Sequence, residues 1–280
     1  LQCEIGEKLK WEYVGMIVEP SGMDVFTHLA WEEYLMEEVS GPVLMLWQSA
    51  CAGVVGKSEN PWRESRWALM EEEGVPVAGR WSGGGRVDHD EGNLNYCIVT
   101  DREAYREAQA FETVLDALSR VGADASLACK SNIRVSEGKV SGTAFAFRKG
   151  RVLHHGTLLL DSDLDRLERY LASECAVIET HAVASVPAKV ANLGVSVEQM
   201  KEALRAAFQD HYEGVIRDVV MPEAAQIQVR LDKLRSDAWI WGTTPRFSIE
   251  VDGQPIDIDR NKLQILNLVK PHLFNIEKIF

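Results

Sequence analysis

Three consecutive glycines, Gly83–Gly85, lie in a polar stretch that runs from residue 80 to residue 95 and reads RWSGGGRVDHDEGNLN. Glycines in series allow positive φ angles and a close approach of the backbone to a ligand, so several N–H groups can point at one anion. A flexible turn can have the same letters, but this run is longer and carries polar side chains at fixed distances: Arg80, Ser82, His89 and Asn93. The stretch therefore predicts a ligand-binding loop.

A lysine further along the chain is a second candidate for chemistry. Lys139 follows a Glu137–Gly138 turn and precedes Val140–Ser141–Gly142, so it is expected to begin a strand that closely approaches a ligand. A point charge on a long, flexible stem suits contact with a phosphate or a carboxylate. The alternative is a solvated lysine in a turn.

Apolar spacing outlines the elements that must position these residues. Helices are predicted over 23–38, 61–73, 104–121, 162–173, 196–212 and 222–236. Strands are predicted over 42–48, 52–56, 75–81, 95–100, 125–129, 132–136, 139–147 and 151–160. Helices and hairpins in this order indicate an α/β or α+β domain around a mixed sheet. Regular β–α alternation is lacking, which argues against Rossmann and TIM-barrel folds.

Composition narrows the class of protein. The chain has 280 residues, of which 46% are hydrophobic and 26% charged, as in ordinary globular proteins. No apolar run approaches ~20 residues, so no membrane span is expected. Five scattered cysteines and a start without a secretory apolar region indicate a reducing cytoplasm. The net charge of −13 argues against nucleic-acid binding, so local donors must hold any anionic ligand.

Six segments in a fixed order resemble the lipoate–protein ligase A family, over roughly residues 20–250. The glycine stretch matches that family's RRxSGGGxVxHDxGNLN pattern, including Val87. Residues 137–144 resemble its GKxSGxA motif, and residues 154–160 its HHGTLL strand. The other three are 55–64 for GxxQNPWxE, 185–193 for SVRSRVTNL and 241–247 for WxxGxTPxF.

The resemblance implies a mixed-sheet domain of the biotin/lipoate protein ligase type. It also implies activation of lipoate by ATP and Mg²⁺ to lipoyl-AMP, followed by transfer to a lysine of a lipoyl-domain or H-protein-like carrier. Lys139 would be the catalytic contact, touching both the acyl carbonyl and the phosphate. Contacts to the acyl adenylate would come from Arg80, Ser82, Gly83, Gly84, Gly85, Val87, His89, Asn93, Ser141, Gly142, His155, Gly156 and Thr157.

Within that set, individual roles can be assigned. Arg80 would face the phosphates, and Asn93 would hydrogen-bond the nucleotide or its Mg²⁺. His89 could be a general base, but bracing of the loop together with Asp90 is preferred. His155 would anchor its strand beside the site. Trp81, inside the loop, could form a wall of the acyl tunnel.

Several positions depart from the family pattern. Gly79 replaces the first arginine of the doublet, Glu59 replaces glutamine, and Pro187 and Lys189 replace two arginines. A transferase that uses a pre-activated lipoyl or octanoyl group, through Lys139 or a Cys129 thioester, therefore stays open as an alternative. A non-catalytic binding protein on the same fold is a second alternative.

The family's large domain ends near residue 247, which predicts a catalytic domain over 1–247 and a short extension over 248–280. The fuller family members carry a C-terminal accessory domain, so a separate accessory protein is expected as a partner.

Overall fold

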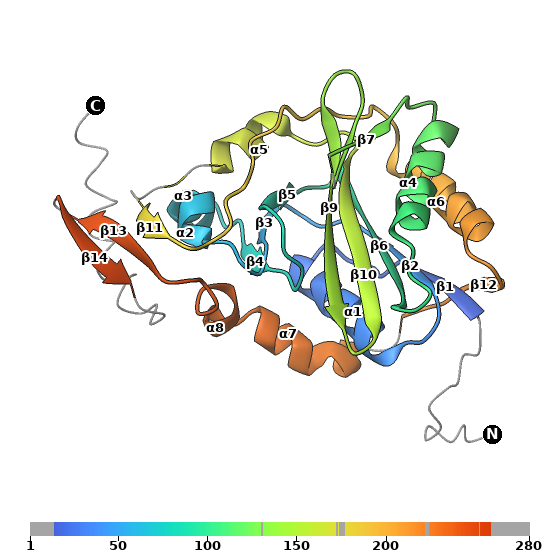
Figure 1. Ribbon diagram of the computed structural model, residues 1–280, viewed down its shortest axis with the longest axis horizontal. Coiled ribbons are helices and arrows are strands. Elements are labelled where there is room, and N and C mark those ends of the chain that lie inside the picture. Colours follow the sequence, from blue (N-terminus) through green and yellow to red (C-terminus); the bar gives the residue numbers. More distant parts are fainter. Residues whose placement is uncertain are drawn as a thin grey trace.

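An eight-stranded mixed sheet forms the centre of the molecule (Figure 1). The computed structural model describes residues 14–129, 131–171, 173, 177–221, 224–251 and 253–258. In spatial order the strands are β12 (Val215–Asp218), β1 (Val14–Val18), β2 (Val43–Trp47), β6 (Asn93–Asp101), β10 (Arg151–Leu159), β9 (Lys139–Arg148), β8 (Asn132–Arg134) and β7 (Ser126–Ala128). β1 is parallel to both of its neighbours, and all other pairs are antiparallel.

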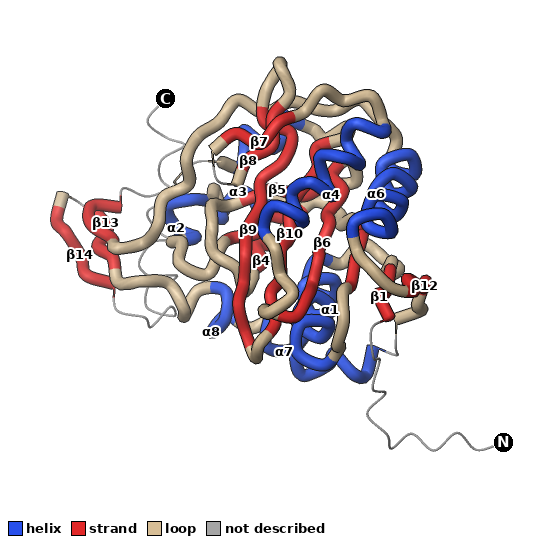
Figure 2. Tube along the Cα trace, turned by 45° about the vertical axis from the view of Figure 1, so that its right-hand side comes forward, coloured by secondary structure: helices blue, strands red, loops and turns tan. Residues whose placement is uncertain are grey.

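Helices cover both faces of this sheet. Because successive side chains of a strand point to opposite faces, β2 sends Leu44 and Leu46 into one apolar cluster and Met45 into another. The first cluster is closed by α4 (Glu107–Arg120) and α6 (Val197–His211), which lie side by side in both views (Figures 1 and 2). The second is closed by α1 (Val25–Glu38) and α7 (Gln228–Leu234), the latter preceded by η1 (Ala224–Ile227).

Two three-stranded sheets lie beside the large one. The first has the order β4 (Val77–Gly79), β3 (Ala52–Val55) and β5 (Val87–His89). The second has the order β11 (Val177–Thr180), β13 (Phe247–Val251) and β14 (Gln254–Ile258). A third apolar cluster joins the second small sheet to α2 (Pro61–Glu64) and α3 (Trp67–Glu72), through Trp62, Trp67, Phe247, Ile249 and Ile258. The remaining helices are α5 (Leu164–Tyr170) and α8 (Asp237–Ile240).

The structure corrects some sequence-based boundaries. The helix predicted over 61–73 is interrupted, because Ser65 is extended and the Arg66 amide donates to the Tyr170 carbonyl instead of continuing α2. The strand predicted over 75–81 is confined to β4. Strands β1, β5, β11 and β12 and helix α8 were not predicted. No helix in the described part of the chain combines the length and apolar character needed to cross a membrane. The predicted domain division falls at the start of β13, and residues 259–280 lie outside the described residues.

Candidate functional site

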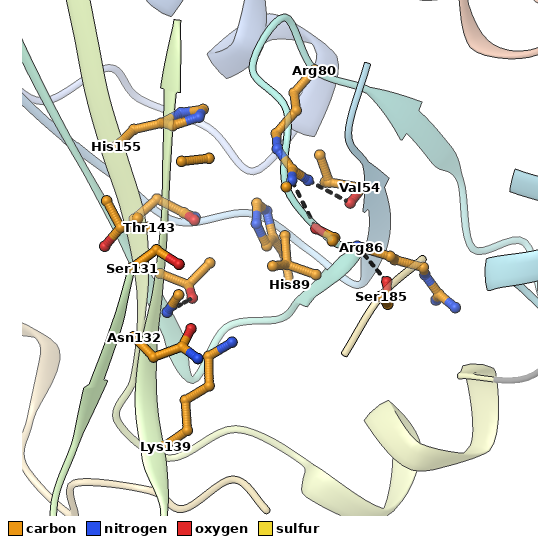
Figure 3. Close-up of a pocket in the computed structure, with 18 of the residues that line it drawn as sticks. Val54, Arg80, Arg86, His89, Ser131, Asn132, Lys139, Thr143, His155 and Ser185 are labelled. Atoms are coloured by element: carbon orange, nitrogen blue, oxygen red, sulfur yellow. Dashed lines mark hydrogen bonds between the residues drawn. The ribbon is translucent and has the colours of Figure 1, made fainter. Parts of the chain in front are cut away.

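Two adjoining cavities lie where β9 and β10 of the large sheet face the small sheet β4-β3-β5. The first measures about 320 Å³ and the second about 660 Å³. They share the lining residues Arg86, Val87, Lys139, Gly142, Thr157, Ser185 and Val186. Figure 3 shows the first cavity, with His155, Thr143 and Lys139 on one side and Arg80, Val54 and Ser185 on the other.

The glycine loop joins β4 to β5 and is held by one arginine. The Arg80 guanidinium is buried and donates to the carbonyl oxygens of Gly83 and Gly85, both at 2.7 Å, and to that of Val54 at 2.9 Å. Burial lowers the pKa of Arg80, and the carboxylates of Glu59 and Glu32 act in the opposite direction. Arg80 lines the first cavity. Its guanidinium N–H groups, however, are directed at the glycine loop and Val54, and not at a phosphate site as the sequence suggested.

Glycine is required in this loop by its backbone conformation. Gly84 has a φ of +86°, a region that side chains with a Cβ rarely adopt. The loop also approaches the end of β3 closely, since a Cβ added at Gly56 would lie 2.2 Å from the Gly84 carbonyl oxygen. The sequence GGG thus encodes a tight, pre-shaped cavity wall.

A chain of buried hydrogen bonds runs from α1 to this loop. Glu32 accepts from Trp47 Nε1 at 3.1 Å and pairs with His155 Nδ1 at 2.8 Å. His155 Nε2 lies 2.6 Å from Ser82 Oγ, which accepts from Arg80 Nε at 3.0 Å. Because a carboxylate only accepts, His155 carries its proton on Nδ1 and Ser82 donates to Nε2. The chain orients Arg80 and hence the glycine loop.

The arrangement has the polarity of a Ser–His–acid triad, but it does not expose a nucleophile. Ser82 is fully buried and lines neither cavity. A serine that attacks a substrate must reach the reacting carbon. Ser82 is therefore a structural member of the relay.

His89 is held neutral in the first cavity. Burial, together with the positive charge of Arg80, lowers its pKa to about 3. Its ring meets that of Trp47 edge-on, with centroids 5.2 Å apart. The Asp90 carboxylate accepts from the Gly92 and Asp163 amides at 2.9 and 2.8 Å. This geometry favours the bracing interpretation, since a group with so low a pKa is a weak base.

Lys139 lies at the junction of the two cavities and lines both. Burial lowers its pKa, and the charges of Arg134 and Arg80, both positive, act in the same direction. Among the described residues its ammonium group has no hydrogen-bond or ion-pair partner. A partly buried cation without an anion is a natural place for an anionic ligand.

A segment without regular secondary structure crosses the site, and we call residues 181–192 the strap. The Val183 amide donates to the Ser58 carbonyl at 3.0 Å, and Arg63 donates to the Val183 carbonyl at 2.6 Å. At its other end the strap pairs with the backbone of Lys139, through hydrogen bonds of 2.9 Å and 3.0 Å from Lys139 N to Lys189 O and from Ala191 N to Lys139 O. The SVPAKVANL motif therefore meets Lys139 through its main chain, while the side chains of Ser185 and Asn192 hydrogen-bond to neighbouring segments.

Most of the predicted site residues are brought together. The first cavity is lined by Arg80, Gly84, Gly85, Val87, His89, Lys139, Gly142, His155, Gly156 and Thr157. Ser141 lines the second. Ser82, Gly83 and Asn93 line neither. Asn93 is buried and donates from Nδ2 to Asn95 Oδ1 at 3.2 Å, so it orients a lining residue.

The lining residues that were not predicted include Glu32, Thr143, Ser185 and, as a site residue, Trp47. The sequence contains a signal for Glu32, because it is a charged residue at a position of α1 that faces the apolar core. Ser185 was present in the strap motif but had no assigned role.

Two sequence-based suggestions do not match the geometry. Trp81 lines neither cavity and packs on Trp239, with ring centroids 4.8 Å apart. Cys129 is exposed in a turn with a φ of +58° and also lines neither cavity. The expected position of Mg²⁺ near Asn93 stays a prediction, and the described residues include no group of three or more His, Cys, Asp or Glu side chains that could hold a metal ion.

The fold of this chain is similar to that of solved lipoate–protein ligases. LipL1 from P. falciparum, solved with lipoate, matches with a TM-score of 0.70 and 23% identity, over 87% of this chain and 80% of that one. A bi-partite lipoate protein ligase from Thermoplasma acidophilum, solved with its E2 lipoyl domain, matches with a TM-score of 0.69 and 23% identity, over 82% of this chain and 96% of that one. A lipoate–protein ligase A bound with ATP matches with a TM-score of 0.69 and 25% identity, over 81% and 98%.

The match to a family model covers most of the structure that forms the site. The model of the lipoyl protein ligase A/B catalytic domain matches residues 24–209, which include the glycine loop, Lys139 and the strap. The chain belongs to the lipoyl protein ligase A/B catalytic domain family and is an enzyme of the lipoate–protein ligase type.

Proposed function

We propose that the protein activates lipoate with ATP to lipoyl-AMP and then transfers the lipoyl group to a specific lysine of a carrier protein. The observation that carries this proposal is the position of Lys139, a half-buried cation at the junction of two cavities. A mixed anhydride of an acid and a phosphate has its reactive centre between an apolar chain and a nucleotide. Lys139 stands where such a centre would lie.

The two cavities differ in their lining, which supports placing the acyl chain in one and the nucleotide in the other. The first is lined by the apolar side chains of Leu29, Val54 and Trp47, beside the His155–Glu32 pair, which suits an acyl chain. The second is larger and combines leucines of α5 with charged residues, among them Lys189 of the strap and Arg63. We assign the nucleotide to the second cavity.

The first step joins the acid to the nucleotide. A carboxylate oxygen of lipoate attacks the α-phosphorus of ATP, and the bond from that phosphorus to the β-bridging oxygen breaks as pyrophosphate leaves. Negative charge grows on the α-phosphate oxygens in the transition state. Lys139 and the N–H groups of the glycine loop are the fixed donors that can stabilise this charge.

In the second step the amine of the carrier lysine attacks the acyl carbon. The bond from that carbon to the AMP oxygen breaks, the amine loses a proton, and an amide forms with AMP as leaving group. Since the nucleophile belongs to the carrier, the enzyme needs none of its own. The buried Ser82 and the peripheral Cys129 agree with this requirement.

Cofactor and partners follow from the same proposal. The described residues build no cage of acidic side chains, so Mg²⁺ would be held largely by the phosphates of ATP and by water, as is usual for this ion. The carrier would be a lipoyl domain or an H-protein-like protein, by similarity to the ligase solved with its E2 lipoyl domain. That ligase is bi-partite, so we also propose a separate accessory protein for the activation step.

The test compares Lys139→Ala with wild type in transfer from preformed lipoyl-AMP to a lipoyl-domain carrier, and in activation of lipoate with ATP, Mg²⁺ and the accessory protein. Lipoylation should fall by about 10²-fold or more, the scale of removing one transition-state donor. Lys201→Ala is the matched control, because Lys201, on α6, pairs with Glu19 and lines neither cavity. Mass spectrometry of the carrier and release of pyrophosphate measure the two steps separately.

Two results would contradict the proposal. Carrier modification by Lys139→Ala at the wild-type rate would remove the assigned role of Lys139. An acyl adduct on Cys129, formed from a pre-activated acyl donor, would place the protein among the thioester transferases.

A further inference from the structure

One buried carboxylate outside the two large cavities joins the segments that form their walls. Glu59 is 2% exposed and lines neither large cavity. Its Oε2 accepts from the Gly56 amide at 2.6 Å. Its Oε1 accepts from the Arg86 amide at 2.8 Å and from Ser185 Oγ at 2.9 Å.

These three donors belong to three separate parts of the chain. Gly56 follows β3, Arg86 ends the glycine loop and Ser185 lies in the strap. Arg86 and Ser185 line both cavities, and the Arg86 amide also lies 3.0 Å from Ser185 Oγ. The Ser185 amide makes a further contact with Glu64 Oε2 at 3.2 Å.

The chemistry of the three donors requires a carboxylate. Two are backbone N–H groups, which can only donate, and a carboxylate is the side chain that offers acceptors on both oxygens. A glutamine amide would turn its NH₂ toward either the Gly56 or the Arg86 N–H. The family pattern has glutamine at this position, so glutamate is a feature of this chain.

We infer that the Glu59 carboxylate is a positioning group that ties the strap to the glycine loop and so keeps both cavities in register around Lys139. The inference rests on the proposed function for its effect on turnover, but its structural part stands without it. Ordering of the strap brings Ser185 and Val186 against both cavities. Loss of the tie should therefore weaken the binding of nucleotide and acyl adenylate more than it changes the chemistry at Lys139.

The charges around Glu59 make this tie sensitive to acid. Burial raises the pKa of Glu59, the Gly56 amide, Arg80 and Ser185 lower it, and Glu64 raises it. Glu64 is paired with Arg63, and the Arg86 guanidinium is turned away toward Asp88. The tie is complete above the pKa of Glu59 and is lost as the pH falls through it, because protonation turns an acceptor into a donor.

Hydrogen exchange of the ligand-free protein tests the tie directly. Glu59→Gln should speed exchange of the Ser185 amide, and of whichever of the Gly56 and Arg86 amides faces the NH₂ group, by at least about tenfold, the scale of one lost hydrogen bond to a charged group. Ser185→Ala should speed exchange in the strap but leave the Gly56 amide protected. Glu33→Gln, which alters another buried glutamate paired with Lys233, should leave all three amides unchanged.

Kinetics supply the second readout. Glu59→Gln should raise KM for ATP several-fold with a smaller fall in kcat, and the wild-type rise in KM at acid pH should disappear. Unchanged exchange at the three amides in both Glu59→Gln and Ser185→Ala would overturn the inference. So would a uniform rise over the whole sheet, which would mean loss of global stability. Failure of lipoylation alone, with the exchange pattern as expected, would count against the proposed function and not against the tie.

Discussion

At the scale of single residues, the contribution of the Gly84 backbone to ligand binding can be tested by comparison with another glycine of positive φ. Gly150, in the turn between β9 and β10, has a similar φ of +75° and lies far along the hairpin from Lys139. Neither glycine has a backbone contact that a Cβ would meet. The two positions therefore carry similar backbone strain, but only Gly84 lines a cavity, and only there would a Cβ lie close to a side chain, 3.2 Å from the Arg80 guanidinium.

We predict that Gly84→Val weakens binding of lipoyl-AMP at least about tenfold, while Gly150→Val leaves the affinity unchanged. Each substitution should cost about 1–3 kcal/mol of unfolding free energy, because valine is forced into a left-handed conformation. Titration calorimetry with lipoyl-AMP measures the affinity, and urea denaturation measures the stability. Equal affinities in the two variants would reduce the glycine loop to an ordinary turn.

At the scale of elements, β10 shows which site residues the sequence could identify and which only the folded structure reveals. The HHGT run identified His155 because it lies in a recognisable motif, and it predicted the strand correctly. It could not identify Glu32, the partner of His155, because the two residues are far apart in the chain and meet only when α1 packs on the sheet. The sequence also assigned Arg80 to phosphates, since an arginine beside a glycine loop does not reveal that its donors are used by that loop.

The same difference between local patterns and long-range contacts explains which helices and strands were not predicted. α4 and α6 were predicted because their apolar residues repeat at helical spacing and face one cluster. β5 and β12 are three and four residues long and exist through pairing with distant strands, β3 and β1. The strap has no periodic pattern, so only its motif drew attention to it. Local patterns predict local elements, and the convergence of segments on Lys139 is a property of the folded chain.

Two adjacent histidines of β10 face opposite sides of the sheet and differ in role. His155 joins the relay to Ser82, whereas His154 packs among Phe111 and Phe145 with centroid distances of 4.8 Å. Burial lowers the pKa of His154 to about 3. The folded state therefore takes up a proton less readily than the unfolded chain, so stability is lost as the pH falls from about 6.5 toward 3.

We predict that His154→Phe makes stability less dependent on pH. Between pH 7.5 and pH 5.0 the unfolding free energy of wild type should fall by about 2 kcal/mol more than that of the variant. Lipoylation should be retained, because His154 lines neither cavity. Urea denaturation at the two pH values, followed by tryptophan fluorescence, measures the difference. A variant with the same acid sensitivity as wild type would mean that His154 is not the group responsible.

At the scale of the whole molecule, the second small sheet connects distant parts of the chain. β11 leads directly into the strap and is paired with β13, and this sheet is anchored on α2 and α3 by Trp62 and Trp67. Both roots of the strap are thus fixed, one by this sheet and one by Lys139. Its middle is not covered: Val186 borders both cavities and is 85% exposed.

The exposure of the strap should affect formation of the adenylate more than transfer of the lipoyl group. Formation of the adenylate needs water to be excluded while charge develops on the phosphates, and a cover over the site serves that purpose. Transfer needs the carrier lysine to enter, and the carrier itself can cover the site at that step. An accessory protein should therefore speed activation more than transfer.

We predict that the protein supplied with preformed lipoyl-AMP modifies a lipoyl-domain carrier efficiently, whereas lipoate plus ATP gives little product until an accessory protein is added. The measurement is the rate of carrier lipoylation by mass spectrometry from the two donors, with Lys139→Ala as the control for non-enzymatic acylation by lipoyl-AMP. Lipoylation at similar rates from both donors, with no partner present, would show that the exposed strap closes over the adenylate unaided.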